Sequence, residues 1–136
     1  MGYDLQITRK PSQFDKSPDI TLDEWLEVVE NDPELTWSAL NRKTSPYMAD
    51  WSGSGKYPCW LDYSLASAYS TSCLYSKNPT DEMIDKMVQI AKLLNAKVLG
   101  EEDEEYLGDR WVSALEMDIT TGKLTGRRVY RGAERR

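Results

Sequence analysis

Five consecutive carboxylate side chains form the densest run of charge in the sequence, between Gly100 and Tyr106. They are Glu101, Glu102, Asp103, Glu104 and Glu105. Clustered carboxylates can hold a hard cation such as Ca²⁺ through their oxygen atoms, or pair with arginine side chains of a protein partner. They can also form a solvated loop between strands, because water and salt screen like charges over about 8 Å. The residue types alone leave these three interpretations open.

A docking surface is the interpretation that neighbouring residues favour. Tyr106 follows the carboxylates directly, and tyrosine is a side chain that often carries interface energy. The calcium interpretation lacks the EF-hand spacing with its central glycine. We therefore predict a partner-binding surface at residues 101–106, with Asp109 nearby and Trp51 as a second aromatic anchor, and we predict no cofactor and no metal.

Most familiar catalytic chemistry is excluded by residue type. The chain has no histidine, which rules out Ser-His-Asp and Cys-His catalysis and histidine zinc sites. SGSGK at residues 52–56 is not a phosphate loop, because Asp50 fills the leading glycine position and Tyr57 follows the lysine. A carboxylate enzyme stays open, since it needs only a carboxylate pair with one member in a dry pocket. We expect a protein that is not an enzyme.

Charge is distributed unevenly along the 136 residues. The formal net charge is -6, but residues 127–136 hold five Arg and one Glu and sum to +4, which leaves -10 for the rest. An acidic body repels nucleic-acid phosphates and attracts basic proteins. We therefore predict a basic protein partner, no nucleic acid and no membrane, with the basic segment 127–136 as a solvated tail or one that folds back on the acidic body.

Length and hydropathy predict one cytoplasmic domain over residues 1–136. A chain of this size buries roughly two-thirds of its unfolded surface without help from metals or disulfides. The opening residues are polar and lack the apolar stretch of a signal peptide. We therefore expect Cys59 and Cys73, the two cysteines, to be reduced thiols, although their number alone would permit a disulfide.

Two helices are predicted with clear ends. The first spans Thr21–Glu30, where Thr21 and Glu24 form a capping box and Ile20 and Trp25 occupy the positions of a hydrophobic staple. The second spans Pro79–Leu94, with Asn78 as its cap and Asn95 as a left-handed ending. One face of this second helix is apolar, formed by Met83, Met87, Ile90, Ala91 and Leu94.

Alternating side chains predict the strands. Tyr3, Leu5 and Ile7 share one side of the first strand, and residues 58–65 and 68–76 alternate like a strand pair. Residues 97–99 form a short strand before the acidic loop, and residues 111–119 and 124–130 favour a final hairpin around TTGK. The predicted fold is α+β, a mostly antiparallel sheet of about five strands with two helices packed on one face.

Three stretches together resemble a family of small bacterial proteins. They are MGYDLQITRK, ITLDEWLEVVENDPEL and SKNPTDEMIDKMVQIAKLLNAKVLGEEDEEY, against family patterns MxYDLxITR, EWL followed by DPEL, and KNP–helix–LxAxVxGDDGExY. The chain departs from the family at Asp103, where the pattern has glycine. Residues 61–76 look longer than in the family, and the residues after Tyr106 have no counterpart.

That family resembles immunity proteins of bacterial toxin systems. The resemblance implies an inhibitor that binds its cognate toxin stoichiometrically and blocks it, which needs no catalytic residue. The alternatives are an adaptor or structural protein that acts through its aromatic surface, and a carboxylate- or metal-dependent enzyme.

Overall fold

The computed structural model describes residues 3–10, 20–39, 43–54, 59–64, 73–101, 103–108 and 111–131. These residues form two α-helices and nine strands joined in a single sheet. The helices are α1 (Leu22–Asn31) and α2 (Asp81–Leu93), and a 3-10 turn, η1, spans Ser52–Ser54. The strands are β1 (Asp4–Thr8), β2 (Leu35–Trp37), β3 (Ala49–Trp51), β4 (Cys59–Ser64), β5 (Cys73–Lys77), β6 (Lys97–Leu99), β7 (Glu105–Gly108), β8 (Trp111–Met117) and β9 (Leu124–Arg131).

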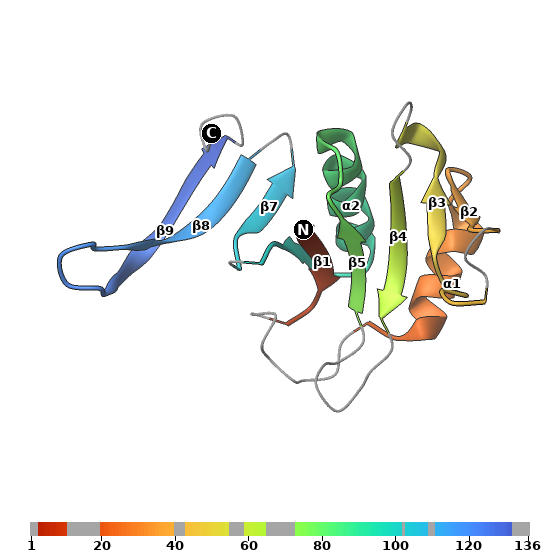
Figure 1. Ribbon diagram of the computed structural model, residues 1–136, viewed down its shortest axis with the longest axis horizontal. Helices are drawn as coiled ribbons and strands as arrows, with labels where there is room; N and C mark the ends of the chain where they lie inside the picture. The colour runs from red at the N-terminus through yellow and green to blue at the C-terminus, as the bar shows by residue number, and fades with distance from the viewer. Residues whose placement is uncertain are drawn as a thin grey trace.

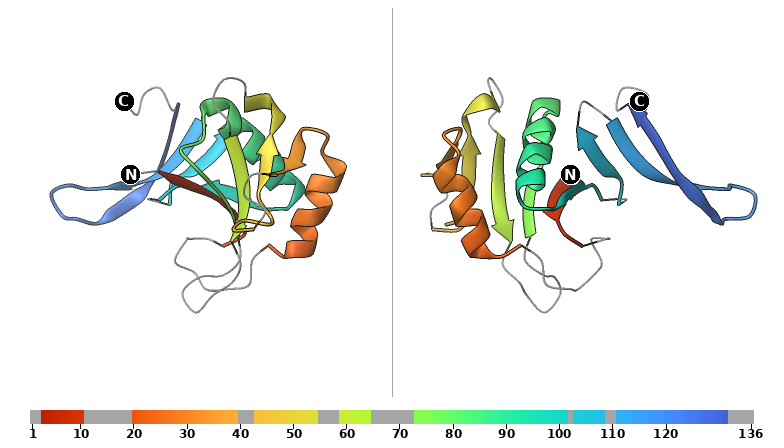
Figure 2. Two further views of the ribbon diagram at one scale, coloured as in Figure 1. Left: turned by 45° about the vertical axis from the view of Figure 1, so that its right-hand side comes forward. Right: turned by 180° about the vertical axis from the view of Figure 1, so that it is seen from behind.

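The sheet has the order β2-β3-β4-β5-β1-β6-β7-β8-β9, and its neighbouring strands are all antiparallel. Both helices lie on one face of it, as seen from behind in the right-hand view of Figure 2. The α+β class, the antiparallel pairing and the placement of the helices are therefore confirmed. The β8–β9 hairpin extends away from the helix-covered part of the sheet (Figure 1).

The expectation of about five strands is wrong, because nine are present in the described residues. Strand β6 lies where the sequence predicted a short strand, at Lys97–Leu99. Strands β2 and β3 have three residues each, which is too short for alternation to be clear in the sequence. Strand β7 begins at Glu105, inside the stretch that was predicted as an acidic loop. Pairing with neighbouring strands, which the local sequence does not encode, fixes these short segments.

Helix α1 begins as predicted. The Thr21 hydroxyl accepts a hydrogen bond from the Glu24 backbone N–H at 3.2 Å, and the Glu24 carboxylate accepts one from the Thr21 N–H at 3.0 Å. Ile20 and Trp25, at the two staple positions, are both fully buried. The Trp25 indole N–H donates to the Tyr47 carbonyl at 2.8 Å, which fixes α1 against the chain that leads into β3.

Helix α2 begins two residues later than predicted. Its N-cap is Thr80, whose hydroxyl accepts from the Met83 N–H, so the assignment of Asn78 as the cap is wrong. Asn78 instead adopts φ 49° and exchanges two hydrogen bonds of 2.8 Å with the backbone of Tyr3. The left-handed ending at Asn95 is confirmed, with φ 51°.

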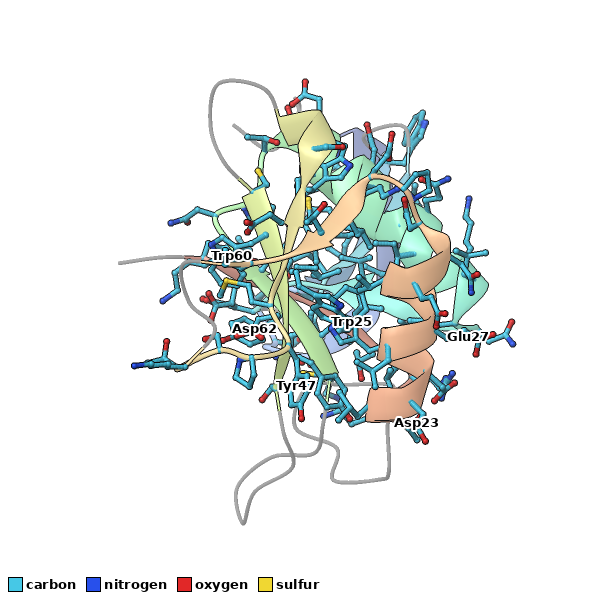
Figure 3. The ribbon with its side chains drawn as sticks, turned by 90° about the vertical axis from the view of Figure 1, so that its right-hand side faces the viewer. Asp23, Trp25, Glu27, Tyr47, Trp60 and Asp62 are labelled. Carbon is cyan, nitrogen blue, oxygen red and sulfur yellow. The ribbon has the colours of Figure 1, made fainter. Side chains whose placement is uncertain are left out.

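The hydrophobic core lies between the helices and the sheet, where Figure 3 shows Trp25 pointing from α1 toward the strands. Its largest fully buried members include Leu5, Ile7, Leu61, Leu74, Met83, Met87 and Ile90. Cys59 and Cys73 are both buried and form no disulfide with each other. Neither of the two described helices is long and apolar enough to cross a membrane.

Candidate functional site

The acidic stretch forms a tight turn between β6 and β7. The Gly100 N–H donates to the Glu104 carbonyl at 2.9 Å, and the Asp103 N–H donates to the Gly100 carbonyl at 3.1 Å. Asp103 has φ 59°, the left-handed conformation that glycine adopts most easily. Asp103 therefore adopts a backbone conformation that is more usual for glycine.

Glu104 does not lie on the surface, because only 1% of it is exposed. Its Oε2 accepts hydrogen bonds from the hydroxyl of Tyr3 and from that of Tyr106, the second at 3.1 Å. Gly100 makes room for this carboxylate, since a Cβ atom at Gly100 would lie 2.3 Å from it. Glu104, the fourth carboxylate of the run, is therefore not part of the predicted acidic surface. It stabilises the turn by hydrogen bonds beneath the surface.

The other predicted members of this surface differ in exposure. Glu101 is exposed, and its Oε1 accepts from the Asp4 N–H at 2.9 Å. Asp103, Glu105 and Tyr106 are half-buried, and Tyr106 packs against the hydrophobic core. Glu102 and Asp109 lie outside the described residues.

Trp51 does not join the acidic turn. It lies on β3, which four strands separate from β7 in the sheet order. At about 4.8 Å per strand this is a distance of about 24 Å. The Trp51 indole N–H instead points to the Glu34 carboxylate, 3.3 Å away. The structure therefore places Trp51 and the turn in different regions.

A groove with a volume of about 730 Å³ lies between α1 and α2. Four carboxylates line it, those of Glu24, Glu27, Asp32 and Glu34, against a single ammonium group from Lys86. Val28, Leu93 and Leu94 contribute apolar surface. Figure 3 shows Glu27 extending from α1 away from the sheet.

Lys86 closes one end of the groove. Its Nζ lies 2.7 Å from Asp32 Oδ2 and 2.6 Å from Glu34 Oε1, and only 5% of its side chain is exposed. Burial alone would lower the pKa of Lys86, but the hydrogen bonds to the two carboxylates outweigh it and raise the pKa. For Asp32, burial acts to raise the pKa, but the hydrogen bond from Lys86, the backbone N–H of Glu34 and the charge of Lys86 together outweigh burial and lower the pKa. The pKa of Glu34 is lowered by Lys86 and then by Trp51.

Arg9 lies at the other end of the groove. Its guanidinium binds the Glu24 carboxylate, with Nη1 2.9 Å from Oε1, while its Nε donates to the Leu94 carbonyl at 2.9 Å. This contact joins the start of α1 to the end of α2. The Arg9 hydrogen bond, followed by the Thr21 backbone N–H, lowers the pKa of Glu24 to about 2. The two helices are thus tied at both ends of the groove.

This groove was not predicted from the sequence. Its carboxylates come from α1 and from the loop that follows it, and only the fold brings Lys86 to them. One signal was present, because residues 23–34 contain six carboxylates and no basic residue. Within the described residues, no cluster of three or more His, Cys, Asp or Glu side chains is arranged to hold a metal ion.

Comparisons with protein-family models, with curated proteins and with solved structures give no match.

Proposed function

We propose that the protein is an immunity-type inhibitor that binds a basic protein toxin and blocks its active site. The observation that carries the proposal is the groove between α1 and α2, where four carboxylates outnumber the two bases that pair with them, Arg9 and Lys86, on a body that is acidic overall. The partner would present arginine or lysine side chains to this surface. The protein would act by occupying the toxin stoichiometrically, without turnover.

The physical basis is electrostatic competition. Toxins that cleave nucleic acid bind phosphates, and basic clefts suit that purpose. An acidic protein surface can occupy such a cleft in place of phosphate, and complementary charge accelerates the encounter. The exposed carboxylate of Glu101, on the turn, would extend the same negative potential.

The direct test is co-expression with the product of the reading frame next to the protein's own gene. We expect that product to be toxic alone, to be neutralised by this protein, and to form a complex whose affinity falls as salt rises. Salt screens exposed charges, so the dissociation constant should increase severalfold between about 0.05 and 0.3 M salt. Failure to neutralise a toxic neighbour would overturn the proposal.

An adaptor is the second candidate, and the β8–β9 hairpin favours it. Trp111 is 41% exposed and Val129 is 54% exposed. Because Val129 pairs with Ser113, two residues from Trp111, these side chains share one face of the hairpin. A partner that binds there would depend on apolar contact. Its affinity would therefore be indifferent to salt, which distinguishes it from the inhibitor.

A further inference from the structure

We infer that the groove between α1 and α2 binds an amphipathic, basic α-helix of the protein partner. The inference rests on the proposed function, because it specifies which part of the acidic surface is used and which kind of segment enters it. Three properties of the groove carry it: fixed ends, a mixed acidic and apolar lining, and walls made only of helices and their flanking loop.

The groove is formed before any partner arrives. Arg9 ties the start of α1 to the end of α2, and Lys86 ties the loop after α1 to the middle of α2. A partner therefore does not have to order these helices when it binds. Binding sites that are already ordered lose less affinity to conformational entropy.

The lining fits a segment that has both charge and apolar surface. Arg9 and Lys86 already pair with three of the four carboxylates, whereas no base in the described part of the chain pairs with the carboxylate of Glu27. Leu93, on the opposite wall, is 70% exposed. An arginine or lysine directed at Glu27 and an apolar side chain on Leu93 would use both features.

A helix fits this site better than an extended strand. Both helical walls have their backbone hydrogen bonds satisfied internally, so they offer an entering strand no ladder to join. A helix brings its own backbone hydrogen bonds and needs only side-chain contacts, as in other helix-in-groove complexes. The walls have 10 and 13 residues, so they match an occupant of about three turns.

The test uses a synthetic amphipathic peptide of about 14 residues, long enough to form a helix, with lysines flanking a leucine stripe. A control peptide keeps the leucines and replaces each lysine with glutamate. We expect saturable one-to-one binding of the basic peptide in fluorescence anisotropy, with NMR shifts confined to α1, α2 and the loop between α1 and β2. Absence of binding by the basic peptide, or equal binding by both peptides, would overturn the inference.

Matched variants locate the binding site. Glu27→Lys should weaken binding of the basic peptide about tenfold. Glu30→Lys makes the same charge change on an exposed residue of the same helix that does not line the groove, so it should cost less than about threefold. Leu93→Ala should weaken binding of the basic peptide. Ile119→Ala, which removes a side chain of the same size that is 95% exposed and lies between β8 and β9, should not. Equal effects of Glu27→Lys and Glu30→Lys would contradict a specific groove.

The same variants separate this inference from the proposed function. If a toxic neighbour is neutralised with full affinity by the Glu27→Lys variant, the inhibitor remains and the groove assignment is wrong. If wild-type protein does not neutralise it, the proposed function is wrong, whatever the peptide does.

Discussion

The acidic turn and the groove between the helices use carboxylates in opposite ways. The turn has five carboxylates in a row, yet the structure buries Glu104 beneath Gly100 between two tyrosine hydroxyls. The groove collects carboxylates from α1 and the loop after it, and holds most of them with Arg9 and Lys86. Charge density along a sequence therefore does not measure charge density on a surface.

The two regions also differ in what their carboxylates stabilise. Glu104 fills a space that a side chain on Gly100 would occupy, so its role is packing and hydrogen bonding within one turn. The carboxylates of the groove join segments that are distant in the sequence. Mutations should therefore separate a carboxylate needed for stability from one available for binding.

The largest expected effect is that of Glu104→Ala. It removes a buried carboxylate that accepts from two phenols, and it should lower the free energy of unfolding by about 2–4 kcal/mol. Glu27→Ala, in the groove, should change that free energy by less than about 0.5 kcal/mol. Urea denaturation of both variants gives the comparison. Similar values for the two would contradict the distinction between the regions.

The packing of the turn can be checked with Gly100. A methyl group there would lie 2.3 Å from the Glu104 carboxylate, so Gly100→Ala should also destabilise the protein, by about 2 kcal/mol. In the double variant, Gly100→Ala with Glu104→Ala, the new methyl group no longer clashes, because the Glu104 carboxylate has been removed. The combined loss should therefore be smaller than the sum of the single losses, which is the signature of direct contact.

The next effect concerns Lys86. Lys86→Met leaves the partly buried Asp32 carboxylate without its cation, and we expect a loss of about 2 kcal/mol at neutral pH. Binding of a basic partner should not weaken, because the groove becomes more negative. A stability equal to that of the wild type would mean that the ion pair contributes nothing net.

The pH dependence sharpens this prediction. The pKa of Glu24 is lowered to about 2 from 4.5, so the stability it contributes is present above pH 4.5 and is lost as the pH falls toward 2. The pKa values of Asp32 and Glu34 are also lowered, so the stability that these carboxylates contribute is likewise lost as the pH falls. The pKa of Lys86 is raised above 10.5, so its contribution is present below pH 10.5 and is lost at higher pH. Lys86→Met should remove the part of the alkaline loss that Lys86 causes, leave the part that comes from Tyr75, whose pKa burial also raises, and keep the acid loss that Glu24 causes.

Local patterns predicted the helices well and the site poorly. The capping box of Thr21 and Glu24 and the left-handed Asn95 involve residues within one turn of each other, so the sequence contains all that is needed. The N-cap at Thr80 was not predicted, because the Asn78 side chain accepts a hydrogen bond from the backbone N–H of Tyr3, which is far away in the sequence. The burial of Glu104 and the groove have the same origin, since each depends on partners from other elements.

The smallest expected effect tests the backbone of the turn. Asp103 has φ 59°, where a side chain is strained and glycine is not. Asp103→Gly should therefore raise the free energy of unfolding by about 0.5 kcal/mol, the relief of strain exceeding the added entropy of the unfolded chain. Asn95→Gly, at φ 51° after α2, is the matched control outside the acidic turn, since asparagine tolerates this conformation and gains less. Urea denaturation of both variants gives the two values. A gain at Asp103 no larger than that at Asn95 would contradict the strain assigned to the Asp103 backbone.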